Sequence, residues 1–203
     1  MYFRLNRLSS TMSSPTLRSR RDLPPSLFLH AGLGAVFVMV GYFMAVLVHF
    51  EWLLGSWSTP FVLMVVVSVM VMVLLTVRQE EGGLQYGRAF GLSLLAGWLA
   101  RLGYNMFNLL YFGLLHPDHA EDYANMLADK STEALAVFGI GLDAEAQDST
   151  TMAEMFREQA LWSLTPAGQA VDAMTALLWV SLVAAIVSAI LRRTPDGQET
   201  LGA

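Results

Sequence analysis

Long apolar stretches alternate with polar segments along this chain of 203 residues. The stretches are residues 26–50, 60–77, 89–115 and 167–191. The first two contain no Asp, Glu, Lys or Arg, the third contains only Arg101, and the fourth contains only Asp172. Each is long enough to cross about 30 Å of hydrocarbon as a helix, and none shows the regular polar face of a soluble helix. The pattern predicts an all-α fold, an integral membrane four-helix bundle.

The composition supports this interpretation and excludes several kinds of chemistry. Hydrophobic residues make up 55% of the chain and charged residues only 14%, which is unusual for a soluble protein. There are no cysteines, so disulfides, thiolate catalysis and cysteine-based zinc or iron–sulfur sites are excluded. The sequence also lacks a phosphate-binding loop, an HExxH motif and a recognisable set of Ser, His and acid. We therefore expect no enzymatic activity and no cofactor.

The charges between the stretches are sorted by sign, and this predicts an orientation. Nine arginines lie before the first stretch, between the second and third, and after the fourth: Arg4, Arg7, Arg18, Arg20, Arg21, Arg78, Arg88, Arg192 and Arg193. The segment 116–165 instead has ten acidic residues against Lys130 and Arg157. Because basic residues resist translocation, both termini should be cytoplasmic. The expected domains are a basic cytoplasmic tail (1–25), a membrane domain (26–193) and a second cytoplasmic tail (194–203).

The acidic segment between the third and fourth spans should form an extracytoplasmic helical hairpin over residues 118–163. Apolar positions at helical spacing predict a first helix from Ala120 to Phe138, ended by the glycines that follow. Asp143 is a candidate cap for a second helix that runs to about Trp162. Thr165 and Pro166 then form a typical start signal for the fourth span.

Arg101 is the least expected residue in the apolar stretches, because an unpaired cation inside a membrane costs at least about 2.5 kcal/mol. Asn105 and Asn108 follow it on one helical face, and Asp172 on the fourth span is the natural acidic partner. If the outer ends of both spans lie level, Arg101 and Asp172 differ in depth by about 13 Å. Direct pairing then requires a register shift, a long reach or a bridging Asn, and Asn108 is the better match in depth to Asp172.

Two functions of this intramembrane polar cluster remain open. Ionisable groups inside membranes often line ion or proton routes. The simpler interpretation is a hydrogen-bonded clasp between helices, worth about 0.6 kcal/mol per contact. The spans hold a single acid and no interior proline, whereas a transport route more often has several acids or broken helices.

Two histidines lie where the third span ends. His116 and His119 are three residues apart among acidic residues, so they are candidate metal ligands. Acidic residues there are equally explained as favourable first-turn residues of a helix that starts after Pro117. On this second interpretation no metal is expected.

Small residues at four-residue steps, such as Gly87 with Gly91 and Gly41 with Ala45, predict close helix packing. The contact can be within one chain, with a second copy or with another membrane protein. The lipid bilayer is the other expected partner. Since topology explains the placement of the arginines, no nucleic acid is expected.

The order of these parts resembles a known family. It combines GRAFG at Gly87–Gly91, HPD at His116–Asp118, TP at Thr165–Pro166, and a fourth span that ends in two arginines. From about Ser26 onward the chain resembles the bacterial membrane family named domain of unknown function 4199. That resemblance implies a multi-pass protein of the bacterial inner membrane with no assigned biochemistry and no functional residues to carry over.

The leading functional hypothesis from the sequence is a structural or interaction role, exerted through the acidic outer hairpin. The alternative is a small transporter or proton-coupled channel. It would use Arg101, Asn105, Asn108 and Asp172.

Overall fold

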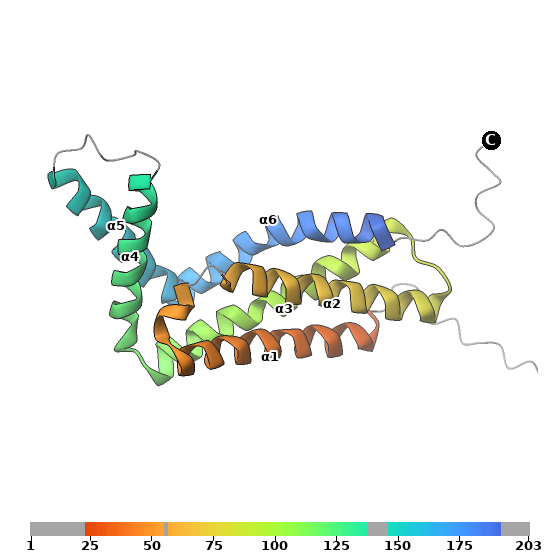
Figure 1. The fold of residues 1–203 in the computed structure, drawn as a ribbon. Coiled ribbons are helices and arrows are strands. Elements are labelled where there is room, and N and C mark those ends of the chain that lie inside the picture. Colours follow the sequence, from red (N-terminus) through yellow and green to blue (C-terminus); the bar gives the residue numbers. More distant parts are fainter. Residues whose placement is uncertain (1–22, 55–56, 138–145, 192–203) are drawn as a thin grey trace, which may run out of the picture.

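The computed structural model describes residues 23–54, 57–137 and 146–191. Within these residues the chain forms six α-helices and two short helical turns (Figure 1). In order they are α1 (Pro25–Val48), the 3₁₀ turn η1 (Phe50–Leu54), α2 (Ser58–Glu81), α3 (Tyr86–Leu110), the π-helical turn η2 (Tyr111–Leu115), α4 (His119–Val137), α5 (Ala146–Leu164) and α6 (Pro166–Leu191). The all-α fold class is confirmed. The predicted tails lie almost entirely outside the described residues.

Three of these helices, α1, α2 and α6, are long and apolar enough to cross a membrane. Their outward surfaces are also apolar: Leu47 of α1 is 78% exposed and Leu178 of α6 is 74% exposed. Large exposed apolar surfaces of this kind are typical of proteins that contact lipid. The third predicted span, α3, is not among the three, because its polar side chains lower its hydropathy.

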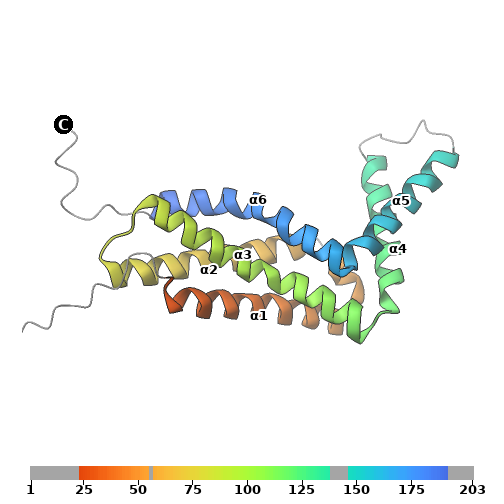
Figure 2. The same cartoon turned by 180° about the vertical axis from the view of Figure 1, so that it is seen from behind.

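The helix α3 is the centre of the packing. It lies against α1, α2 and α6, and the four long helices run side by side in both views (Figures 1 and 2). Phe107 of α3 is fully buried and its ring packs 5.3 Å from Tyr42 and 5.0 Å from Phe43 of α1. At Gly103 the backbones of α3 and α1 approach so closely that a Cβ atom would collide with Ala35. The least apolar of the four helices is therefore the one most enclosed by the others.

The small-residue prediction is only partly correct. Gly41 packs under the ring of Phe61, but nothing lies within 4 Å of the Cβ positions of Gly87 and Gly91. Both of these glycines are in the first two turns of α3, at exposed positions. Within the described chain, the close approach of α3 to α1 occurs at Gly103 instead.

The predicted element boundaries hold within a few residues, with two informative differences. The helix α2 continues past Arg78 to Glu81, because charged residues do not end a helix; Gly82, with a φ of 71°, ends it. The predicted span 89–115 divides into α3 and the wider turn η2, which closes with a bond from the His116 N–H to the Tyr111 carbonyl, 2.7 Å long.

The predicted outer helices are present as α4 and α5, which pack against each other and project from one end of the long helices (Figure 1). Arg157 of α5 donates to Asn125 of α4 at 2.9 Å and lies 3.7 Å from Glu121. The proposed cap Asp143 and the glycines between the helices lie outside the described residues. At its other end, α5 runs into α6 with only Thr165 between them.

Candidate functional site

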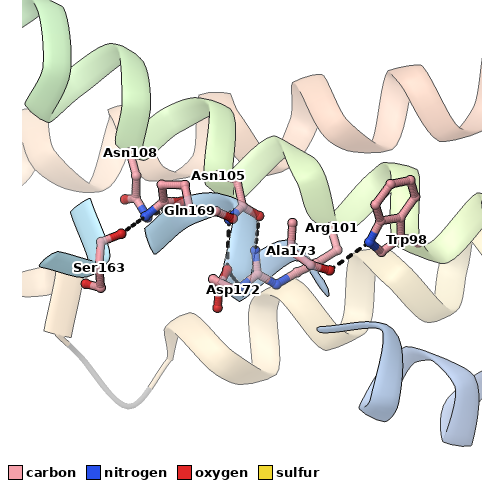
Figure 3. A network of polar contacts seen from close by, with 8 residues as sticks. All are labelled: Trp98, Arg101, Asn105, Asn108, Ser163, Gln169, Asp172 and Ala173. Atoms are coloured by element: carbon pink, nitrogen blue, oxygen red, sulfur yellow. Dashed lines mark hydrogen bonds and ion pairs between the residues drawn. The ribbon is translucent and has the colours of Figure 1, made fainter. Parts of the chain in front are cut away.

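The predicted polar residues of α3 meet α6 in one connected cluster (Figure 3). Arg101, Asn105 and Asn108 are spaced by four and three residues, so they share one face of the helix, and all three are buried. This face points at the first turns of α6, where Gln169 and Asp172 lie three residues apart on a matching face. These polar side chains thus face inward, which avoids the free-energy cost of exposing them to lipid.

Arg101 is paired directly with Asp172. Its Nη2 donates to Asp172 Oδ2 at 2.9 Å, and its Nη1 donates to Asn105 Oδ1 at 2.9 Å. The guanidinium also lies over the ring of Tyr104, 4.4 Å from the centroid, where a cation is attracted by the aromatic face. The positive charge is therefore compensated by one anion, one amide and one ring.

Asn105 connects this ion pair to the start of α6. Its Nδ2 lies 2.8 Å from Asp172 Oδ2 and 2.8 Å from Gln169 Oε1, with the Gln169 backbone carbonyl at 3.1 Å. Gln169 Nε2 in turn donates to the Ser163 carbonyl of α5 at 2.6 Å. A continuous set of hydrogen bonds therefore runs from the middle of α3 to the end of α5.

The expected depth match between Asn108 and Asp172 is wrong. Asn108 instead approaches Gln169, with 3.4 Å between Nδ2 and Oε1. The depth calculation assumed that the outer ends of the two spans are level. Asn108 lies opposite the first turn of α6. The rest of the predicted third span, from Asn108 to Leu115, therefore continues for about 10 Å past that turn, calculated from the helical rise. This offset is what allows Arg101 to reach Asp172 directly.

Gln169 was not predicted as part of the cluster, although it links Asn105, Asn108 and Ser163. Its position three residues before Asp172 places it on the same helical face, and that spacing was the available signal. Trp98 was also not predicted: its Nε1 donates to the Ala173 carbonyl at 2.8 Å. An amide or indole in an apolar helix carries no charge, so it is less conspicuous in sequence than Arg101.

A cavity of about 530 Å³ adjoins the ion pair. Residues of α1, α2, α3 and α6 line it. Its lining includes the polar residues Tyr42, Ser58, Thr59, Arg101, Tyr104 and Asp172 and the apolar residues Val62, Leu63, Trp179, Leu182 and Val183. The side chain of Asp172 is 40% exposed, whereas that of Arg101 is 11% exposed. The carboxylate is therefore the accessible member of the pair.

A second cavity, of about 320 Å³, lies at the opposite end of α2 beside Arg78 and Gly82 and includes none of the cluster. At the end of the long helices that carries α4, Tyr123 of α4 is close to Tyr104. Burial raises the pKa of the Tyr123 phenol well above its usual value, and the neighbouring Tyr104 adds to the effect. This phenol is therefore neutral at physiological pH.

His116 and His119 lie beyond the end of α3, outside the polar cluster, and come close to Asp118. The structure thus separates the predicted residues into two groups, one between the long helices and one at the junction of η2 with α4.

Comparison with known proteins gives the family but no activity. The family model described as a protein of unknown function (DUF4199) matches residues 29–193, which includes all the residues of both groups. No curated protein and no solved structure matches the chain. The match covers most of the chain, and the chain belongs to the DUF4199 family.

Proposed function

We propose that this chain is a four-span membrane protein that acts as a small transporter or proton-coupled channel. In this proposal α1, α2, α3 and α6 cross the bilayer of a bacterial inner membrane, both termini are cytoplasmic, and α4 and α5 lie outside. The Arg101–Asp172 pair is the site where a proton or solute is handled. No enzymatic step is part of the proposal.

The observation that carries the proposal is the accessibility of Asp172. A charged pair that only holds helices together needs no access from outside, whereas this carboxylate is 40% exposed and lines a cavity of about 530 Å³. Cavities of roughly 300–1,000 Å³ with a few convergent polar groups are the size of small-molecule sites. An ionisable group that remains accessible inside a membrane domain favours a functional role over a purely structural one.

Crossing of the membrane by α3 is supported by its surroundings. Its most polar residues, Arg101, Asn105 and Asn108, are buried and have partners on α3 itself and on α6. The helix therefore presents little unpaired polar surface to lipid. Its length of 25 residues corresponds to about 37 Å at the helical rise, enough to span the hydrocarbon layer.

Proton flux into liposomes tests the function. Purified protein is reconstituted with an entrapped pH-sensitive dye, and a potassium diffusion potential drives protons inward. We expect flux above that of protein-free liposomes, and we expect Asp172→Asn to abolish it, because the amide keeps the shape of the side chain but cannot carry the proton. Glu81→Gln is the matched control, since Glu81 pairs with Arg88 at 2.6 Å at the far end of α2.

Two results would overturn the transport proposal: wild-type flux equal to that of protein-free liposomes, or equal flux in the wild type and Asp172→Asn. A loss of flux in Glu81→Gln as well would point to general damage. Size-exclusion chromatography and circular dichroism of each variant separate that case from a specific effect.

The proposed topology is tested independently, because the chain has no cysteine of its own. Single cysteines at Asp129 on α4 and at Glu80 on α2 are both at exposed positions. A membrane-impermeant maleimide applied to intact spheroplasts should label Asp129→Cys and leave Glu80→Cys unlabelled until the membrane is opened. The reverse pattern would contradict the orientation.

A second candidate function is binding of a partner protein through α4 and α5. It is favoured by three exposed apolar side chains on helices with several exposed acidic residues: Val137, Met155 and Trp162. A photo-reactive residue at Met155 should then give a discrete cross-linked product in cells, and one at Gln79 should not. The absence of that product at Met155 would count against this candidate and leave the transport proposal standing.

A further inference from the structure

The second group of predicted residues lies at the corner where η2 passes into α4. The π-helical turn ends at Leu115, and His116 leaves the helix with a φ of −139°. Pro117 and Asp118 separate His116 from the start of α4 at His119, and the chain turns there so that α4 runs across the direction of the long helices (Figure 1). This corner stacks the two imidazole rings on each other, with centroids 4.9 Å apart and an interplanar angle of 11°.

The corner also brings three ligand atoms close together. One atom each from His116, Asp118 and His119 lie within 4.8 Å of one another. The distance from His119 Nε2 to Asp118 Oδ2 is 3.8 Å. In a tetrahedral zinc site with bonds of about 2.0–2.2 Å, neighbouring ligand atoms are about 3.4 Å apart. To reach that spacing from separations of up to 4.8 Å the side chains must rotate toward one another, and the Asp118 side chain is 75% exposed.

His119 is held in an orientation suited to binding through Nε2. Its Nδ1 lies 2.7 Å from the hydroxyl of Tyr111, which belongs to the same π-helical turn. A ligating histidine usually donates its other ring N–H to a neighbouring acceptor, and this bond sets the tautomer. In the tautomer in which Nδ1–H donates to Tyr111, Nε2 carries the lone pair and is available to a metal on the side of Asp118.

We propose that His116, Asp118 and His119 form a binding site for a divalent transition metal, with Zn²⁺ as the expected ion. Two imidazoles and one carboxylate are the ligand types that Zn²⁺ takes in proteins, whereas Mg²⁺ and Ca²⁺ prefer oxygen alone. Water completes a fourth position, since the corner is exposed. The bound ion ties the end of η2 to the start of α4 and so sets the direction in which α4 leaves the long helices. The site does not depend on the proposed transport function.

Calorimetric titration of Zn²⁺ into the full chain tests this site. The protein is purified with an affinity tag that contains no histidine, and it is stripped with a chelator beforehand. We expect one equivalent of Zn²⁺ per chain, and we expect His116→Ala and His119→Ala each to weaken binding at least about tenfold. His49→Ala is the matched control, because His49 is an exposed histidine at the end of α1 and outside the cluster.

Tyr111→Phe tests the positioning role separately from ligation. The ring is retained, so its packing against Phe107, 5.4 Å away, should survive, while the hydroxyl that orients His119 is lost. Zn²⁺ binding should weaken about tenfold while the helical content stays unchanged. A thermal shift with Zn²⁺ in the wild type, missing in the His116→Ala/His119→Ala double variant, is the second readout.

The proposal is overturned if the wild type binds no Zn²⁺, or if the double variant binds it as tightly as the wild type. Loss of binding in His49→Ala with the cluster variants unaffected would place the ion elsewhere and equally contradict it. Circular dichroism and size-exclusion chromatography of the variants distinguish a lost ligand from a lost fold.

Discussion

The two members of the Arg101–Asp172 pair should differ in how much stability is lost when each is replaced. Asp172→Asn keeps the shape and a hydrogen-bond acceptor but removes the negative charge. Arg101, with its side chain 11% exposed, then has only uncharged partners, which are Asn105, the new amide at position 172 and the ring of Tyr104. Breaking a buried ion pair typically costs about 3–5 kcal/mol. Because Asp172 is 40% exposed, solvent screening reduces this, and we expect a loss of about 2 kcal/mol.

Replacing Arg101 should cost less stability than replacing Asp172. Arg101→Met removes the cation and replaces it with an unbranched, uncharged side chain. Asp172 can remain hydrated through the cavity, so the expected loss is about 1 kcal/mol or less, the scale of hydrogen bonds between membrane helices. Replacing both members of a buried pair by neutral groups is often tolerated, so the double variant should resemble Arg101→Met. The double variant should then be about 2 kcal/mol more stable than the sum of the single losses predicts.

The measurement is unfolding of purified protein in mixed micelles by increasing SDS, followed by far-ultraviolet circular dichroism. The four proteins of the cycle are compared under identical conditions. Equal losses for Asp172→Asn and Arg101→Met, together with additive behaviour in the double variant, would show that the pair is fully solvated. That outcome would refute the reasoning from burial.

Two further predictions concern residues whose roles are set by contacts between helices. Gln169→Ala removes the amide that bonds Asn105 and Ser163, and the free energy of unfolding should fall by about 1 kcal/mol in the same assay. Gln79→Ala, at an exposed position, should leave it unchanged. Equal losses of stability in the two variants would argue against the bridging role. Gly103→Ala should cost about 1–3 kcal/mol because its Cβ collides with the α1 backbone, whereas Gly91→Ala, with open space around it, should be neutral or slightly stabilising. The Gly103 prediction fails if both alanine variants unfold at the wild-type SDS concentration.

Much of the fold could be predicted because long apolar runs have few alternative structures. The helices α1, α2 and α6 coincide with three predicted spans within a few residues, and α4 and α5 follow the apolar spacing of the acidic segment. The prediction that the ends of the third and fourth spans lie at the same depth was wrong, and so was the match in depth between Asn108 and Asp172 that followed from it. Hydropathy reports how long a helix is, but the neighbouring helices decide how far it extends beyond them.

The candidate sites divide in the same way. Arg101 and Asp172 were identifiable because a charge in an apolar stretch needs a partner, and the direct bond between them is now explained by the offset between α3 and α6. Gln169 was missed because a neutral amide leaves no comparable signal. The histidine corner was visible only as a spacing, and its geometry depends on the π-helical turn, whose extra width the sequence does not reveal.

By itself, the sequence determined the all-α class, the apolar stretches and the sign-sorted charges that predict an orientation. These depend on the transfer of each residue between water and an apolar medium, which is a property of local composition. Only the tertiary structure decided which polar groups meet. That choice depends on helix ends, tilts and close approaches such as Gly103 with Ala35. A shift of one helical turn, about 5 Å, is invisible in composition and yet decides whether Arg101 reaches a carboxylate or an amide.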